Sequence, residues 1–395
     1  MKRFLLGAAA AVLSCALALG AVSWAVTARM PQLPTALGDL NSTEKITGRW
    51  LVETAAENPQ TVTVYGSSEL RTFEIPTHPA NFFSGQRAGF QVNLVGRGSC
   101  QSLIHALSVA ASGDALTGTK VVLITSPQSY VEGGIAPDLF KANFSEQQYL
   151  ALMRDPGIPE KMKLRFSARV DELLDEYAAS TGTERGVSAS ALLAENAEKK
   201  AVRTLLAPYT ALSGALAELK DRYTAKRLIR SAALPEASAA AYPIDWAAEE
   251  KTALSDAEKA TDNNDFGILN DYYNTYIGRK LDMQEGMDAE LSYSVSEEYG
   301  DLRLLLDVCA LKGIEPLFVH VPLHGAWSDY TGFSAEKRAE YYENVRKIVE
   351  EYPNVTMLDL TGNEYEPYYL CDIMHLGWKG WLDVDKALVE CFAER

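Results

Sequence analysis

Short apolar runs alternate with segments of helical periodicity along this chain, and this alternation most constrains its fold. Thr61-Val62-Thr63-Val64-Tyr65 is typical of the runs, because it is brief and largely β-branched, as buried strands are. The expected strands are residues 61–65, 90–95, 120–125, 317–321 and 356–360. Strands that alternate with helices predict an α/β fold with a doubly wound parallel sheet.

The expected helices lie between or after these strands, at residues 102–111, 302–312, 335–351 and 377–391. Gly313 is a good stop for the second of them. Residues 145 to about 262 are different, because they are rich in Ala, Leu, Glu and Lys and carry hardly a strand signal. We therefore expect an α/β domain over residues 31–395 with a helical insertion at about 145–262.

The first 30 residues predict a membrane anchor. Basic Lys2 and Arg3 precede the uncharged stretch Phe4 to Val26, which as a helix would be roughly 34 Å long. A cleaved signal peptide is the competing interpretation, but its apolar region is usually shorter, and Trp24 suits an interfacial position. Because the basic end stays inside, we expect one transmembrane helix, location at the cell membrane and an extracellular domain.

Composition excludes some classes of partner. The formal net charge is −16, the opposite of the basic balance that nucleic-acid binding needs. The cysteines are scattered singly, with no spacing that resembles a zinc site. We therefore expect no nucleic-acid partner, no metal site and no cofactor.

A serine stands where the first expected strand ends, in Tyr65-Gly66-Ser67-Ser68-Glu69. The ordinary interpretation is a turn, since Gly and Ser are turn residues. The alternative is a nucleophile at the carboxyl end of a parallel strand, where open α/β sheets build their sites.

A base for such a nucleophile lies near the other end of the chain, in Asp372-Ile373-Met374-His375. This spacing brings the carboxylate back beside the imidazole, so that the acid holds one ring nitrogen and the other faces the nucleophile. The remaining histidines suit other roles: His78 caps or lies in a loop, His105 packs on a helix, and His320 lies in the core.

Two further strand ends carry groups that could stabilise an oxyanion. Gly96-Arg97-Gly98 follows the second strand, and glycines there let backbone N–H groups approach a ligand closely. Ser126-Pro127-Gln128 follows the third strand, and Gln128 could present its side-chain amide. An early serine and a late D-x-x-H form the pattern of the SGNH/GDSL superfamily, whereas the G-x-S-x-G elbow is absent.

Nearly the whole chain resembles the DltD family of D-alanyl transfer proteins, which act in teichoic acid modification in Gram-positive bacteria. The matching stretches are Gly66 to Leu70, His78-Pro79, Gly96-Arg97-Gly98 with Gln101-Ser102, Ser126-Pro127-Gln128, Asn264-Asp265-Phe266-Gly267, Asp329 to Gly332, and Asp372 to Trp381. One departure is His324, where the family would have Asn. The resemblance implies an SGNH-hydrolase-like (flavodoxin-like) sheet.

Carried over to this sequence, the resemblance implies that Ser68 is the nucleophile, His375 the base and Asp372 the orienting acid. Gly98 and Gln128 match the oxyanion positions. The candidate supporting residues are Ser67, Glu69, Arg97 and His324.

The resemblance also implies a function. The chain would be a membrane-anchored extracellular acyltransferase that receives D-alanyl groups exported by a membrane O-acyltransferase. It would pass them to hydroxyls of lipoteichoic acid through its Ser-His-Asp triad. Two alternatives stay open: a thioesterase or esterase of the same fold that uses water, and a non-catalytic scaffold for the D-alanylation machinery.

Overall fold

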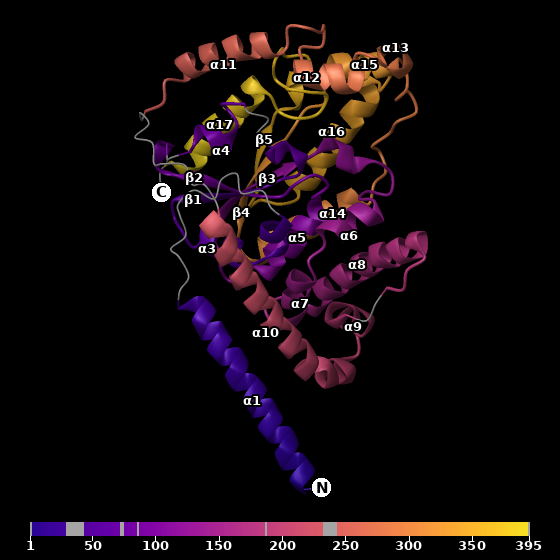
Figure 1. The fold of residues 1–395 in the computed structure, drawn as a ribbon. Helices are drawn as coiled ribbons and strands as arrows, with labels where there is room; N and C mark the ends of the chain where they lie inside the picture. The colour runs from indigo at the N-terminus through magenta and orange to yellow at the C-terminus, as the bar shows by residue number, and fades with distance from the viewer. Residues whose placement is uncertain are drawn as a thin grey trace.

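The computed structural model describes residues 2–28, 43–71, 75–84, 87–185, 188–231 and 243–393 (Figure 1). Its centre is a sheet of parallel strands in the order β2-β1-β3-β4-β5. The strands are β1 (Thr61–Tyr65), β2 (Gln91–Val95), β3 (Lys120–Thr125), β4 (Glu315–His320) and β5 (Thr356–Asp359). This is the order of flavodoxin-like sheets, so the expected α/β class and doubly wound parallel sheet are confirmed.

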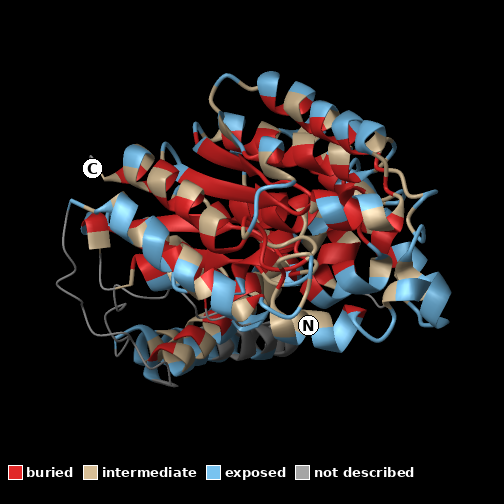
Figure 2. Ribbon diagram, turned by 90° about the horizontal axis from the view of Figure 1, so that it is seen from above, coloured by how far each residue is buried: buried red, intermediate tan, exposed pale blue. Residues whose placement is uncertain are grey.

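Helices cover both faces of the sheet, because alternate side chains of each buried strand point to opposite sides. On β3, Val121 and Leu123 join the core under α5 (Ser102–Ala111), α14 (Glu298–Leu311) and α16 (Ala335–Glu350). Val122 and Ile124 join the core on the other face, under α4 (Pro79–Phe82), α11 (Trp246–Ala260) and α17 (Trp378–Phe392). Figure 2 shows the strands buried between helices whose outer faces are exposed.

The described part of residues 145–262 consists mainly of helices. Its helices are α7 (Glu146–Arg154), α8 (Glu160–Thr181), α9 (Ala189–Glu195), α10 (Lys200–Ser231) and α11. They do not form one layer, because α7, α8 and α9 pack on the α5 side of the sheet, whereas Ala253 and Ala257 of α11 pack with α17 on the opposite face. The segment therefore crosses from one face of the sheet to the other.

Shorter helices complete the chain around this frame. They are α2 (Thr43–Thr47), α3 (Trp50–Ala56), α6 (Pro137–Asn143), α12 (Asn270–Tyr272), α13 (Leu281–Gln284) and α15 (Gly325–Thr331). Short 3₁₀ turns follow β1 and β3 directly, at η1 (Ser68–Leu70) and η3 (Pro127–Tyr130). These two turns hold candidate site residues just beyond the sheet.

The N-terminal segment is helical, as α1 (Lys2–Thr27), and runs beside α10 (Figure 1). The Lys226 ammonium of α10 donates to the Val26 carbonyl at 3.2 Å. Across the described residues, no helix is both long enough and apolar enough to cross a bilayer. The transmembrane helix expected at residues 4–26 is therefore not confirmed, and the expected end of the anchor at residue 30 lies outside the described residues.

Candidate active site

The candidate site lies at the switch point of the sheet, where the chain order reverses between β1 and β3. These strands pair in parallel, with Val64 opposite Val122 and Tyr65 opposite Leu123. Their carboxyl ends therefore meet at one edge, and the turns that follow carry Ser68 and Gln128. Open α/β sheets bind ligands at this place.

Three of the predicted residues form one chain of hydrogen bonds. His375 Nε2 lies 2.8 Å from Ser68 Oγ, and His375 Nδ1 lies 2.6 Å from Asp372 Oδ2. Asp372 is fully buried, while the His375 side chain is 12% exposed. The structure thus joins a serine and an Asp–His pair that are separated by 307 positions in the sequence. The catalytic role of each stays a prediction.

The Asp372–His375 loop is closed by the Asp372 carboxylate itself. Asp372 Oδ1 accepts hydrogen bonds from the backbone N–H groups of Met374 (2.9 Å) and His375 (2.8 Å), and the Cys371 N–H donates to the His375 carbonyl (2.9 Å). A short Asp side chain commonly organises a turn in this way. With Oδ1 held by the backbone, Oδ2 is fixed toward the imidazole.

The environment of His375 favours its use as a base. Burial lowers the pKa of the imidazole, but the hydrogen bond and charge of Asp372 outweigh burial, so the pKa lies above its ordinary value. Because Asp372 accepts the Nδ1 proton, the neutral ring has its lone pair at Nε2. That atom can accept the hydroxyl proton of Ser68.

The two predicted oxyanion residues follow β2 and β3, the strands on either side of β1. Gln128 is exposed, and its Nε2 donates toward Ser68 Oγ at 3.4 Å. Gly98 is exposed in the loop after β2, and no heavy atom lies within 4 Å of where its Cβ would be. An incoming carbonyl oxygen therefore has one side-chain amide beside the hydroxyl and an open glycine backbone on the adjacent loop.

Arg97 anchors that glycine loop. Its guanidinium donates to Asn143 Oδ1 (2.7 Å) and to the Ala142 carbonyl (2.9 Å), at the C-terminal end of α6. Asn143 Nδ2 in turn donates to the Gly98 carbonyl at 3.3 Å. A cation is favoured at a helix C-terminus, so the contact holds the loop between β2 and α5 in place.

Ser67 and Glu69 organise the turn around Ser68. Glu69 is buried, and its Oε1 accepts from the Ser67 N–H at 2.6 Å. Burial raises the pKa of the Glu69 carboxyl, although the Ser67 N–H and the nearby His375 act in the opposite direction. Across the part of the chain that the structure describes, the Ser68 hydroxyl bonds to His375 and Gln128 and to neither of these two residues, which suits a supporting role.

The turn after β1 also depends on two glycines. Gly96 has φ +152°, and a Cβ at this residue would meet the Gly66 carbonyl oxygen at 1.7 Å. The Gly66 N–H donates to the Val95 carbonyl at 3.3 Å. The backbones beyond β1 and β2 therefore touch, and only glycine at position 96 permits that approach.

His324 lies apart from this hydrogen-bonded chain and caps α15. Its Nδ1 accepts from the Trp327 N–H (3.2 Å), so its Nε2 donates to the Phe266 carbonyl (3.0 Å). Burial lowers the pKa of His324, which matches this neutral form. It lines a pocket of about 310 Å³ together with Asn264 and Tyr368. His324 thus links the 264–267 motif to α15.

The other histidines lie as the sequence predicts. His78 caps α4, because its Nδ1 accepts from the Ala80 N–H at 3.2 Å. His105 is buried on α5, edge-on to the Tyr65 ring, and His320 is buried in β4.

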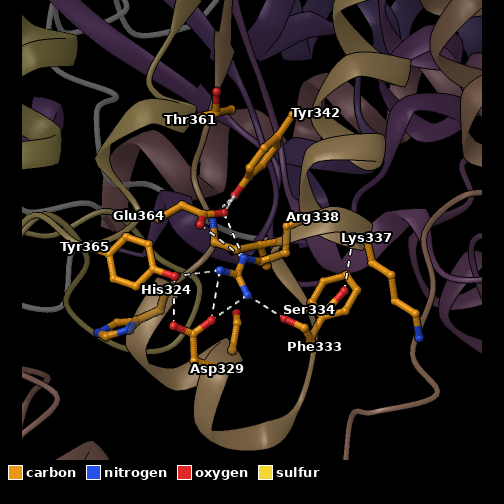
Figure 3. Close-up of polar contacts among 12 residues, drawn as sticks. His324, Asp329, Phe333, Ser334, Lys337, Arg338, Tyr342, Thr361, Glu364 and Tyr365 are labelled. Atoms are coloured by element: carbon orange, nitrogen blue, oxygen red, sulfur yellow. Dashed lines mark hydrogen bonds and ion pairs between the residues drawn. The ribbon is translucent and has the colours of Figure 1, made fainter.

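Sequence reasoning missed a buried cation behind the 310 Å³ pocket. Arg338 of α16 is 1% exposed and donates to Asp329 Oδ1 (3.0 Å), Glu364 (3.1 Å) and the Tyr365 hydroxyl (2.8 Å) (Figure 3). Tyr342, one turn along α16, donates to Glu364 Oε1 at 2.5 Å. The sequence signal that could have revealed this cation is an arginine at a core-facing position of an amphipathic helix.

A family profile and three relatives all carry the same family name. A family profile described as "DltD protein" matches residues 40–393. Protein DltD of Bacillus subtilis (strain 168) is 34% identical over 362 residues, covering 87% of this chain and 86% of the relative. Protein DltD of Lacticaseibacillus rhamnosus is 29% identical (85% and 78%), and that of Staphylococcus aureus (strain NCTC 8325 / PS 47) is 26% identical (83% and 80%).

Proposed function

This chain belongs to the DltD family, which is involved in the D-alanylation of teichoic acids, and we propose that it is a serine acyltransferase that passes D-alanyl groups to lipoteichoic acid. The observation that carries this proposal is the hydrogen-bonded chain of Ser68, His375 and Asp372 at the switch point of the sheet. A serine hydroxyl is a weak nucleophile until a positioned base takes its proton.

In the first step, Ser68 Oγ attacks the carbonyl carbon of an activated D-alanyl donor while its proton passes to His375 Nε2. The Gln128 amide and the Gly98 N–H would stabilise the negative charge that develops on the carbonyl oxygen. The donor's leaving group then departs with the proton from Nε2. A D-alanyl ester remains on Ser68, and Asp372 holds the imidazole throughout.

In the second step, a hydroxyl of the acceptor gives its proton to His375 Nε2 and attacks the ester carbonyl. Ser68 Oγ leaves and recovers that proton, so the enzyme returns to its starting state. The acceptor carries the new ester. Ser68 is thus the nucleophile in the first step and the leaving group in the second, while His375 accepts and then returns a proton in each.

The proposed setting is the outer face of the cell membrane, with the N-terminal segment as a single-pass anchor. Basic Lys2 and Arg3 before the apolar stretch support this orientation. The donor would be loaded by a membrane O-acyltransferase, and lipoteichoic acid would be the acceptor. Protease added to intact cells should digest the domain while cytoplasmic markers survive.

Two variants of adjacent serines test the nucleophile. Ser68→Ala should lower acyl transfer by about 10⁴- to 10⁶-fold and abolish the D-alanyl adduct in intact-protein mass spectra. Ser67→Ala is the matched control, because Ser67 is buried and its hydroxyl makes only a 3.4 Å contact with the Arg97 carbonyl. Wild-type D-alanine ester content in cells whose only copy is Ser68→Ala would favour the scaffold alternative.

A second measurement separates transfer from hydrolysis. The wild-type protein is given a D-alanyl donor with and without lipoteichoic acid, and the products are quantified. Ester formed on the acceptor supports the transferase, whereas equal release of free D-alanine in both reactions supports the esterase that uses water.

A further inference from the structure

One face of α10 exposes large apolar side chains. Leu205, Tyr209, Leu212, Leu216 and Tyr223 are 46–80% exposed. Tyr209, Leu212, Leu216 and Tyr223 follow Pro208, the proline inside this helix, and at about 100° per residue they fall within an arc of roughly 60°, so they form a single stripe along the helix. Scattered exposed apolar residues need no explanation, but an aligned stripe of this kind marks an interaction surface.

The opposite face of α10 is fixed to the body of the protein. Asp221 is buried there, and its Oδ2 accepts from the backbone N–H groups of Arg49 (2.8 Å) and Trp50 (2.9 Å) at the start of α3. Ala225 and Ile229 pack in a small core with α3. The rotation of α10 is therefore set by its buried contacts, and the stripe is held facing outward.

The charge of α10 is unlike that of the rest of the chain. Its sequence contains seven Lys or Arg and two Asp or Glu, a net charge of +5 in a chain of net −16. Arg227 and Arg230 are exposed and share the arc of the stripe, and the exposed Lys220 lies about 20° beyond its edge. Arg227 pairs with Glu44 at 3.4 Å, but both side chains are exposed, so that pair is weak.

We propose that this face of α10 docks on the surface of an anionic lipid bilayer. Leucines would enter the boundary between headgroups and acyl chains, tyrosines would lie at the headgroup level, and the three cations would contact lipid phosphates. The excess of positive charge on α10 favours an anionic surface as the occupant.

The helix that contacts α10, α1, also exposes apolar side chains. Lys226 joins α10 to the end of α1 through the Val26 carbonyl, and α1 itself exposes Leu17 and Trp24. Exposed apolar residues thus lie on two helices that contact each other. This inference concerns the orientation of the domain and does not depend on the chemistry proposed for Ser68.

An environment-sensitive fluorophore on the full-length protein tests the docking. It is attached at Leu212→Cys, in a background where Cys15 and Cys391 are replaced by Ser, and the protein is reconstituted into vesicles. The vesicles contain phosphatidylcholine alone or with about 30% phosphatidylglycerol. The matched control label is at Val295→Cys, which replaces an apolar residue that is 68% exposed away from α10.

The expected result is a blue shift and quenching by lipid-borne quenchers at position 212 in the anionic vesicles, and neither at position 295. Replacing Lys220, Arg227 and Arg230 by Gln should lower the ratio of docked to undocked label by about fivefold per cation. Circular dichroism and thermal melting check that each variant is folded.

Three outcomes would overturn the proposal. The labels at 212 and 295 could behave alike in every vesicle. The label at 212 could be shielded without lipid as the protein dimerises, which would make the stripe a contact between copies. Shielding could also require added membrane protein, which would make it a protein interface.

Discussion

Replacing Asp372 by Asn should disable His375 while leaving its position almost unchanged. Asp372 Oδ1 accepts from the N–H groups of Met374 and His375, and Oδ2 accepts from the His375 ring. The side-chain amide of Asn has one acceptor oxygen, whereas the carboxylate of Asp has two. If its oxygen stays with the two backbone N–H groups, its NH₂ faces Nδ1, and the ring must carry its proton on Nε2.

The reverse orientation of the amide is unfavourable, because it would leave two buried N–H groups without an acceptor at about 1–3 kcal/mol each. The ring therefore adopts the tautomer that can only donate to Ser68. The same change in a Ser-His-Asp triad lowers kcat by about 10⁴, which corresponds to about 5 kcal/mol in the activation barrier. We expect a loss of that size in the acylation of Ser68.

The assay is quench-flow mass spectrometry of the acyl-enzyme, with a D-alanyl thioester as donor, across a range of pH. A general base works as the neutral imidazole, so the wild-type rate should rise as pH passes the raised pKa of His375. Without the charge of Asp372, burial lowers that pKa. The residual activity of Asp372→Asn should therefore rise at a lower pH.

The pH dependence of thermal stability gives an independent check on the Asp372–His375 pair. Because the folded pKa of His375 lies above its ordinary value of 6.5, its protonation stabilises the fold below about pH 6.5, and this contribution is lost as pH rises through the folded pKa. The difference in Tm between wild type and Asp372→Asn should thus be larger at acidic pH. A variant acylated within tenfold of wild type, with the same pH midpoint, would refute the reasoning.

Other positions give further expectations. Gln128→Ala should lower kcat by about 10²- to 10³-fold with little change in Tm, as steady-state kinetics and melting can check; an unchanged kcat would exclude the oxyanion role. Gly96→Ala should destabilise the fold by several kcal/mol in urea titration, because its Cβ has no room. Burial raises the pKa of Glu298, so wild-type stability should fall as pH rises above about 4.5, and Glu298→Gln should flatten that dependence in melting curves. Arg338→Met should cost about 3–5 kcal/mol in urea titration, because it leaves carboxylates without their cation; no loss would contradict the importance of the buried pair.

The sheet was predictable because a buried parallel strand has a strong local signature. Thr61–Tyr65 and Lys120–Thr125 are strands with the expected limits, since both are β-branched apolar runs that end at turn residues. Expected helix ends differ by a few residues: the helix expected at 302–312 begins at Glu298, because its polar first turn, which includes Glu298 and Asp301, carries no apolar periodicity.

The juxtaposition of Ser68 with His375 followed from topology, since residues after parallel strands gather at one sheet edge. The Arg338 cluster could not be derived in the same way. Its partners lie on two separate segments, with Asp329 on α15 and Glu364 and Tyr365 in the loop that follows β5, and no sequence pattern states which carboxylates approach a given guanidinium. Likewise, the composition of residues 145–262 predicted helices but not which face of α10 the body of the protein covers.

The separation of 307 positions between Ser68 and His375 sets the order in which the site becomes competent during synthesis. Asp372 and His375 are three residues apart, and their loop closes through local hydrogen bonds. Ser68 emerges near the beginning, whereas the Asp–His pair is made only after most of the chain has followed. On the proposed function, a truncated polypeptide that ends before Asp372 carries the serine without its base and should be inactive.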